Sequence, residues 1–169
     1  LKPRYEVILF WYNPNITDRE EYDRRLVEVT RYAEGVDVEL VAAAHDPESW
    51  EDATAGLDAE PEGGRRCDIC YAMRLARTGE EADKLGVATI TTTLSISPHK
   101  RVERIAAAAA KALAGTGNEF LAEDFKKQAG FERSAELSKE FGLYRQDYCG
   151  CEPSKREAQE RRKGRRKQR

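Results

Sequence analysis

Four cysteines in two close pairs are the residues of this chain best suited to chemistry. Cys67 and Cys70 are separated by two residues, and Cys149 and Cys151 are separated by one glycine. The chain has no other cysteine. Closely spaced thiols bind metal ions and metal–sulfur clusters, or exchange electrons as a dithiol and a disulfide. We expect a cytoplasmic location, where structural disulfides are rare, so metal or redox chemistry is the first interpretation.

The spacing of the thiols leaves several kinds of site open. A structural zinc site, an iron–sulfur or other redox site, and chance placement are all compatible with C-x-x-C followed by C-x-C. The single glycine between Cys149 and Cys151 would let the thiols share a metal or close a tight disulfide. A structural zinc usually replaces a hydrophobic core, whereas 169 residues are enough to bury one. The cysteines therefore indicate a functional site.

The first half of the chain predicts a strand, a helix and a second strand. Residues 5–12 form an apolar run typical of a buried strand, and residues 18–34 have apolar positions at helical spacing. Residues 36–42 predict the next strand. This order is typical of a parallel βαβ unit. A short helix over residues 47–57 and a loop then lead to Cys67.

The second half continues the alternation. A helix over residues 69–85 places Cys67 and Cys70 at its N-terminus, where exposed N–H groups favour thiolates and metal–sulfur clusters. Further predicted elements are strands over 87–93 and 118–121 and helices over 102–113 and 135–141, the last capped by Ser134. The pattern predicts a three-layer α/β domain with a parallel sheet over residues 1–152.

Polar residues follow two of the predicted strands. Asn13 and Asn15 follow the strand over 5–12, at the sheet edge where α/β proteins bind ligands. Ser95, Ser97 and Lys100 follow the strand over 87–93 and precede a helix, a setting suited to phosphate. Turn formation by the asparagines and helix capping by Ser97, with Pro98 in the first turn, are the structural alternatives.

Charge is distributed unevenly along the chain. The net charge is −2, yet residues 154–169 carry nine Lys or Arg against two Glu. A basic, disordered tail over residues 153–169 is expected, and it indicates either a nucleic-acid partner or a solvated segment without a role. No apolar run approaches the roughly 20 residues of a membrane helix, so we expect no membrane partner.

Several motifs together resemble the QueH-type epoxyqueuosine reductases. The resemblance extends from about residue 5 to residue 151 and is specific because the motifs occur in this order. The motifs are residues 12–16, Glu21, Tyr22, Arg25, residues 66–75, 91–100 and 123–125, Arg133, Ser134, and residues 136–139 and 143–151.

The resemblance implies a fold of the adenine-nucleotide α-hydrolase-like (HUP) group and reduction of epoxyqueuosine to queuosine at the wobble position of tRNA. It implies a [4Fe–4S] cluster with Cys67 and Cys70 as ligands, and a further iron ion nearby. Cys149 and Cys151 would be a redox-active pair or metal ligands, with Tyr148 as a proton donor. The residues expected around the substrate are Tyr12, Asn13, Asn15, Arg74, Ser95, Ser97, Lys100 and Asp124.

One family feature is absent from the sequence. Members carry a first strand that ends in a Cys-Cys-Ala-Pro type motif, which supplies further metal ligands. The chain instead opens at Leu1 with the apparent end of a helix, so we expect a missing N-terminal segment and a sheet without its first strand. Cys67 and Cys70 alone leave a four-iron cluster half-ligated.

Two other functions fit parts of the sequence. A zinc-stabilised RNA-binding module would use the cysteines structurally and the basic tail for binding. An ATP-dependent nucleotide-activating enzyme of the same fold group would bind ATP at the strand edge, although no glycine-rich phosphate loop is visible. Bound zinc without a chromophore, or ATP-dependent adenylation, would distinguish them. A reductase also needs an electron donor, which the sequence does not identify.

Overall fold

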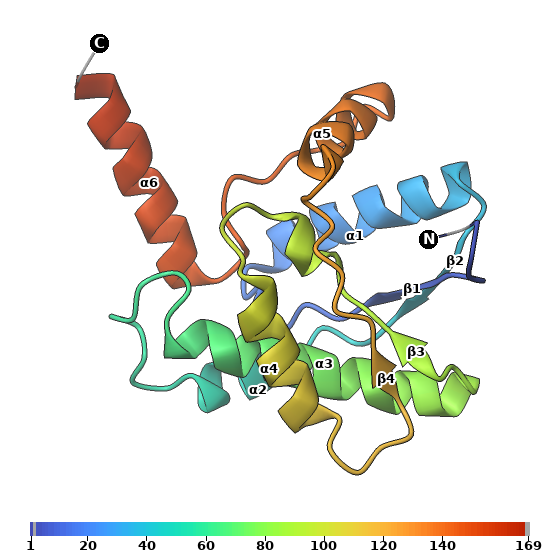
Figure 1. Ribbon diagram of the computed structural model, residues 1–169. Coiled ribbons are helices and arrows are strands. Elements are labelled where there is room, and N and C mark those ends of the chain that lie inside the picture. The colour runs from blue at the N-terminus through green and yellow to red at the C-terminus, as the bar shows by residue number, and fades with distance from the viewer. Residues whose placement is uncertain (2, 168–169) are drawn as a thin grey trace. The chain divides into compact units, whose positions relative to one another are not determined.

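A computed structural model describes residues 1 and 3–167, and Gln168 and Arg169 of the predicted tail lie outside this range. The chain divides into two compact units. The first unit contains Leu1–Asp52 and Phe141–Arg169, and the second contains Ala53–Glu140. Figure 1 labels the elements of both units. The single domain predicted over residues 1–152 stays a prediction.

The first unit contains the predicted βαβ arrangement. Strand β1, Ile8–Trp11, pairs in parallel with β2, Glu39–Ala42, with Ile8 opposite Glu39. Helix α1, Arg19–Gly35, connects the two strands (Figure 1). The short helix α2, Pro47–Ala53, follows β2 and ends four residues earlier than predicted.

Helix α1 is capped at its N-terminus by Asp18. The Asp18 carboxylate accepts the backbone N–H groups of Glu20 and Glu21 at 3.1 and 3.3 Å, which satisfies two donors of the first turn. Three residues of α1 are buried, namely Tyr22, Arg25 and Ala33. An arginine is rarely buried. The groups that Arg25 contacts belong to the site of the second cysteine pair.

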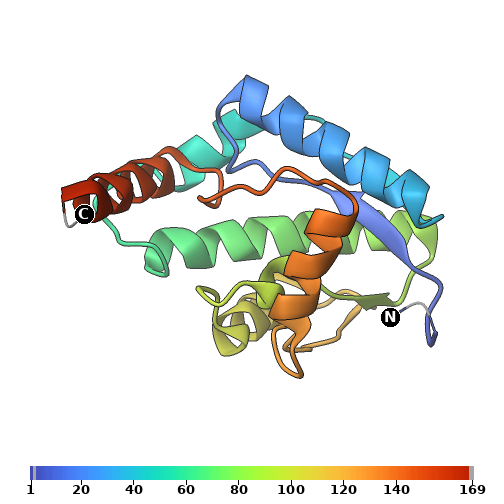
Figure 2. The ribbon, with the colours of Figure 1, turned by 90° about the horizontal axis from the view of Figure 1, so that it is seen from above.

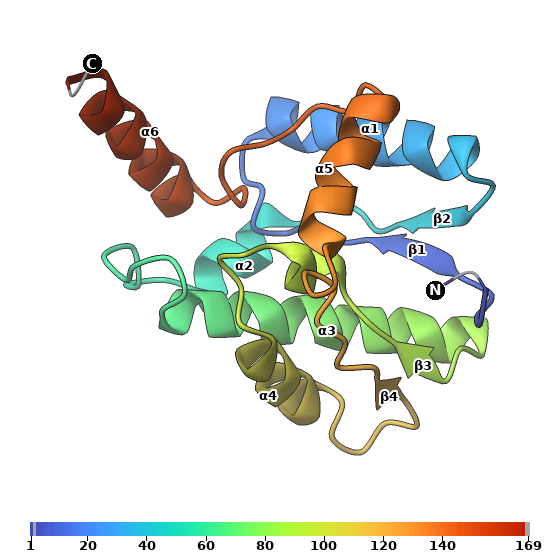
Figure 3. The ribbon, with the colours of Figure 1, turned by 45° about the horizontal axis from the view of Figure 1, so that its top comes forward.

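The second unit contains six elements. They are helix α3 (Arg65–Leu85), strand β3 (Thr89–Ile90), the 3₁₀ helix η1 (Thr93–Ile96), helix α4 (Val102–Ala112), strand β4 (Glu119–Phe120) and helix α5 (Gly130–Glu140). Strands β3 and β4 pair in parallel, side by side in Figure 3. Helices α3 and α4 pack against each other, as Figure 2 shows. The core of this unit includes Tyr71, Leu75, Ile105, Ala109 and Leu113.

A small residue lets the chain after α4 approach α3 closely. A Cβ atom at Gly79 would lie 2.7 Å from Leu113 Cδ2, which is shorter than van der Waals contact. Glycine at this buried position therefore serves packing rather than flexibility. Gly86 ends α3 in the left-handed conformation, at φ 68°, as a C-terminal glycine commonly does.

The basic segment at the end of the chain is helical, which differs from the disorder expected from its charge. Helix α6 covers Glu152–Lys167. Pro153 suits the first turn of a helix, Ala158 is buried, and Lys155 Nζ lies 3.1 Å from Asp18 Oδ2. The burial of Ala158 and the ion pair with Asp18 offset the repulsion between neighbouring positive charges, a tertiary effect that local composition does not report.

Other predicted boundaries also differ. Helix α5 begins at Gly130, so Ser134 lies inside the helix and does not cap it. Helix α4 begins at Val102 after Arg101, so Ser97 is not its cap; Ser97 ends η1, and its Oγ accepts the His99 N–H at 3.3 Å. The third strand keeps two of its seven predicted residues. The local sequence predicted Ser97 and Ser134 as helix caps. Ser97 instead lies in the turn that ends η1, and Ser134 lies inside α5.

Both units are α/β structures with parallel strands, which confirms the predicted fold class. Among the described residues, the strands form two pairs, β1 with β2 and β3 with β4. The wider three-layer sheet stays a prediction. None of the helices described here has both the length and the apolar character needed to cross a bilayer.

Candidate thiol sites

The first cysteine pair lies inside the first two turns of α3. Residues three apart share one face of a helix, so Cys67 and Cys70 face the same direction. Cys67 is 6% exposed, and its Sγ accepts the N–H of Gly63 at 3.2 Å, whereas Cys70 is half-buried. The helical spacing alone therefore places both sulfurs on one face of α3.

Side chains fix the chain where it enters α3. Arg104 of α4 binds both oxygens of Asp68, at 2.9 and 2.6 Å, and donates to the Gly64 carbonyl at 3.2 Å. Arg66 is 2% exposed and donates from Nη1 to the carbonyls of Leu57 and Glu60. Its Nε and Nη2 are buried and have no partner among the described residues. The first turn of α3 is therefore held on both sides.

A buried aromatic and a buried ion pair lie near these thiols. Burial raises the pKa of Tyr71 to about 12, so its hydroxyl stays protonated at neutral pH. Lys100 Nζ lies 6.0 Å from the Tyr71 ring centroid and donates to Glu62 Oε1 at 2.7 Å. The Lys100 ammonium is thus engaged with a carboxylate, and its predicted contact with a substrate phosphate stays a prediction.

The first pair fits part of the ligand set of an iron–sulfur cluster. Such clusters are usually held by four cysteine thiolates, and Cys67 with Cys70 offers two on one helical face. Within residues 1 and 3–167, no group of three or more His, Cys, Asp or Glu side chains is arranged to hold a metal ion. The assignment of Cys67 and Cys70 as cluster ligands stays a prediction.

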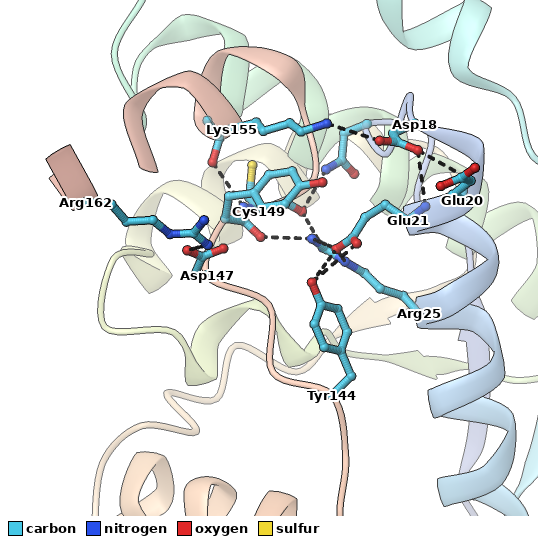
Figure 4. A network of polar contacts seen from close by, with 12 residues as sticks. Asp18, Glu20, Glu21, Arg25, Tyr144, Asp147, Cys149, Lys155 and Arg162 are labelled. Atoms are coloured by element: carbon cyan, nitrogen blue, oxygen red, sulfur yellow. Dashed lines mark hydrogen bonds and ion pairs between the residues drawn. The ribbon is translucent and has the colours of Figure 1, made fainter. Parts of the chain in front are cut away.

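The second cysteine pair lies in the loop immediately before α6. The sulfurs of Cys149 and Cys151 are 3.5 Å apart, and neither is in a disulfide. Cys151 is 3% exposed, and its carbonyl accepts the N–H of Lys155 in the first turn of α6. Figure 4 shows the Cys149 backbone joined to side chains that α1 contributes.

Side chains bind the backbone on both sides of Cys149. The Cys149 carbonyl accepts from Asn15 Nδ2 at 3.2 Å and from Arg25 Nη1 at 3.0 Å. The Tyr148 carbonyl accepts from Arg25 Nη2 at 3.1 Å. The N–H of Cys149 donates to Ser154 Oγ at 3.0 Å, and Ser154 is fully buried. The loop is therefore held by side chains rather than by a helix or a sheet.

The residue between the two cysteines must be glycine. Gly150 has φ 129°, which residues with a Cβ rarely adopt. A Cβ here would lie 2.6 Å from Ile16 Cγ1 and 3.0 Å from Asn15 Nδ2. Both the backbone angle and the packing of the segment around Asn15 and Ile16 thus depend on the missing side chain.

Tyr148, the predicted proton donor, is half-buried beside Arg25. The Arg25 guanidinium carbon lies 5.0 Å from the Tyr148 ring centroid. Burial, and then the nearby carboxylate of Glu21, raises the pKa of the Tyr148 phenol, so the group keeps its proton at neutral pH. A protonated phenol suits the predicted role, which stays a prediction.

The other predicted residues of the first unit have structural contacts. Tyr12 is buried and its hydroxyl donates to Asp46 Oδ2 at 3.3 Å. The carbonyl of Asn13 accepts the N–H of Ile16 at 3.1 Å, which is a turn, as the alternative interpretation held. Asn15 is 3% exposed, and its Oδ1 has no partner in the part of the chain described here. Asn15 also contacts the C-x-C loop, because its Nδ2 donates to the Cys149 carbonyl.

The predicted residues of the second unit are mostly tied to its loops. Ser95 is buried, donates to the Thr92 carbonyl and accepts the Phe125 N–H at 3.5 Å. Lys126 links Asp124 Oδ1, at 2.7 Å, to the carbonyl of Lys100 and lowers the pKa of Asp124. Arg74 is half-buried on α3. Asp124 and Lys100 are thus neighbours, whereas Ser97 serves its own turn.

Sequence reasoning assigned no role to three residues that hold the second pair. They are Glu21, Arg25 and Ser154. Glu21 and Arg25 are four residues apart on α1, a spacing that predicts an ion pair, but nothing in the sequence reports that the pair is buried against a loop more than 120 residues away. Ser154 was expected to lie in a disordered tail.

The units define an α/β protein with two dithiol sites, one on a helix and one in a loop held by side chains. The family profile described as Epoxyqueuosine reductase QueH matches residues 1–157. The chain belongs to this family.

Curated relatives carry the same name. Epoxyqueuosine reductase QueH of Streptococcus pyogenes is 34% identical over 152 residues, which cover 86% of this chain and 60% of the relative. The Haemophilus influenzae relative is 34% identical and covers 90% of this chain and 63% of its own length. The Thermotoga maritima relative is 34% identical and covers 84% and 76%. The chain therefore spans about three fifths to three quarters of these relatives.

Proposed function

We propose that the chain is the reductase that its family name states, reducing epoxyqueuosine in tRNA to queuosine. The observation that carries this proposal is the loop with Cys149 and Cys151, whose sulfurs lie 3.5 Å apart. Two thiols at this separation need only a small movement to form a disulfide bond of about 2.05 Å. The family match favours this function over the zinc-stabilised RNA-binding module and the ATP-dependent enzyme.

The electrons of the reaction balance with the dithiol as donor. When Cys149 and Cys151 close to a disulfide, they release two electrons and two protons. Removal of the epoxide oxygen as water, which leaves an alkene, consumes two electrons and two protons. An external electron donor then returns the disulfide to the dithiol. Tyr148, which keeps its proton at neutral pH, is the proposed proton donor to the leaving oxygen.

We also propose that Cys67 and Cys70 are two ligands of a [4Fe–4S] cluster, with a further iron ion nearby. Their position on one face of α3 and the firmly held first turn support this. When bound, such a cluster supplies electron transfer, and an iron ion supplies Lewis acidity. Among the described residues, no group of three or more His, Cys, Asp or Glu side chains is arranged to hold a metal ion, so the proposal assigns two ligands only.

The substrate contacts and the fold are part of the same proposal. Asn15 has a buried Oδ1 that can accept from a substrate hydroxyl or N–H, and its Nδ2 holds Cys149. Tyr12, Asn13, Arg74, Ser95, Ser97, Lys100 and Asp124 complete the proposed substrate set. The fold proposed is that of the adenine-nucleotide α-hydrolase-like group, and each unit contributes the parallel strand pair that such a fold requires.

Helix α6 is the proposed contact with the tRNA backbone. Arg156, Arg161 and Lys163 are exposed on it, and phosphate contacts through lysine and arginine dominate affinity for nucleic acids. The relatives' name implies a tRNA substrate, which such a helix suits. A cytoplasmic location, where thiols stay reduced, fits four cysteines without disulfides.

The test is turnover of epoxyqueuosine in tRNA by the full chain. The chain is loaded anaerobically with iron and sulfide and mixed with this tRNA and a chemical reductant, and the nucleosides are then measured by mass spectrometry. Queuosine formation above that of a reaction without protein supports the proposal. Stoichiometric zinc, no chromophore and no queuosine would instead support the zinc module.

A further inference from the structure

Arg25 holds both peptide groups that flank the first cysteine of the C-x-C loop. The carbonyls of Tyr148 and Cys149 belong to consecutive peptides on either side of the Cys149 Cα, and Arg25 donates to them at 3.1 and 3.0 Å. A planar guanidinium presents its N–H groups in a fixed fork. Two such bonds fix both peptide planes, and therefore the direction in which the Cys149 side chain leaves the backbone.

The guanidinium is itself locked in place. Its carboxylate partner, Glu21, lies 2.7 Å away, and the two side chains are 8% and 11% exposed. The Tyr144 hydroxyl donates to Glu21 at 3.3 Å, and the Tyr148 ring lies beside Arg25. Figure 4 shows Glu21, Arg25 and Tyr144 converging next to Cys149. A buried arginine with this many partners does not rotate freely.

Three other residues complete the restraint on the loop. Asn15 binds the same Cys149 carbonyl as Arg25, and Ser154 binds the Cys149 N–H. Gly150 leaves no space for the loop to shift toward Ile16, because even a Cβ atom would be too close. The separation of 3.5 Å between the sulfurs is thus a consequence of contacts made to the backbone.

We propose that Arg25 is a positioning residue that sets the equilibrium between the dithiol and the disulfide of Cys149 and Cys151. The inference rests on the proposed function, in which this pair gives two electrons to the substrate. Oxidation joins the two sulfurs and releases two protons, and the fork keeps the sulfurs close enough to make this favourable. Without the fork the loop relaxes, the sulfurs move apart, and disulfide formation becomes less favourable.

The experiment measures the equilibrium constant of disulfide formation in the full chain. Parent and variants are equilibrated anaerobically with mixtures of reduced and oxidised dithiothreitol, and the thiols are alkylated and quantified by mass spectrometry. Arg25→Met removes the charge and the fork, and Arg25→Lys keeps the charge but has no fork. Arg19→Lys is the matched control, since Arg19 pairs with Asp23 on the exposed face of the same helix.

We expect the equilibrium constant of disulfide formation to decrease at least about tenfold in both Arg25 variants. This decrease corresponds to about 30 mV for this two-electron couple. The control should keep the parent value. A parent value in folded Arg25→Lys would overturn the role of the fork, and an equal shift in the Arg19→Lys control would overturn a specific role of Arg25. These measurements need no substrate, so they do not depend on turnover.

Folding is monitored by circular dichroism, because removal of a buried cation leaves Glu21 unpaired. If the Arg25 variants do not fold, Asn15→Ala takes their place, since it removes a neutral donor from the same carbonyl. Asn15→Ala should also lower the equilibrium constant of disulfide formation. A constant equal to that of the parent chain would overturn the inference. A parent chain whose pair never oxidises would contradict the proposed function as well, an outcome distinct from unchanged variants.

Discussion

Cys67 and Cys70 lie inside α3, whereas Cys149 and Cys151 lie in the loop before α6. The helix alone brings the first two sulfurs to one face. The second pair depends on Arg25 of α1, which donates to the Cys149 carbonyl, and on Ser154 in the first turn of α6, which accepts the Cys149 N–H. The first pair shares one helical face, where Cys67 is 6% exposed and Cys70 is half-buried. We expect the C-x-C pair to keep its sulfurs together only while those contacts remain. This difference is the reason for proposing metal binding by the first pair and redox exchange by the second.

The largest effect is expected from removal of the second pair. Cys149→Ser with Cys151→Ser removes the proposed electron source, so queuosine formation by the iron-loaded chain should fall to the level without protein. Iron content should remain at the parent value, because the first pair is intact. Turnover retained with a chemical reductant would confine the pair to re-reduction or to structure.

Gly150→Ala should damage the second pair through the backbone. The clash with Ile16 and the φ of 129° should together cost about 2–4 kcal/mol of unfolding free energy. The matched control is Gly86→Ala, at φ 68° with open space around its Cβ, which should cost about 1 kcal/mol. Urea unfolding measures both. Equal costs would show that the C-x-C loop is not tightly packed.

Ser154→Ala should have a smaller effect. It leaves the N–H of Cys149 without its acceptor in a fully buried position, at a cost of about 1–2 kcal/mol. Ser138→Ala is the control, because the Ser138 hydroxyl donates to a carbonyl within its own helix, and its loss should be nearly neutral. A neutral Ser154→Ala in urea unfolding would mean that another group accepts this N–H.

The smallest effect concerns the ion pair between α6 and α1. Lys155 lowers the pKa of Asp18 below its usual 3.8, so the pair stabilises the fold above that pH and loses its effect as the pH falls through the lowered pKa. Asp18→Asn keeps a capping residue and removes the charge. The variant should lose about 0.5 kcal/mol or less at pH 7, as exposed pairs do. Thermal unfolding should show this difference vanish at low pH, and a difference that persists there would assign it to the cap.

The sequence predicted the elements better than their ends or partners. Apolar runs and helical spacing identified β1, α1, β2 and α4, because these signals are local. They missed that α6 is ordered, because a contact distant in the chain, between Lys155 and Asp18, holds it. They also placed the start of α5 near Ser134, whereas the helix begins at Gly130.

The thiols themselves were evident from their type and spacing. Their supports were not, because a buried Arg25 bound to two carbonyls is set by tertiary structure, and an arginine on a helix is more often exposed.

Metal loading of two double variants tests the division of roles most directly. Three proteins are loaded anaerobically with iron and sulfide. They are the parent chain, the double variant Cys67→Ser with Cys70→Ser, and the double variant Cys149→Ser with Cys151→Ser. Glutathione is present to supply additional thiolates, and visible absorption and iron content are measured. We predict that the chromophore and the bound iron are lost in the variant without Cys67 and Cys70. Both should be kept in the variant without Cys149 and Cys151. Equal loss in both variants would contradict the division and make the four cysteines one metal site.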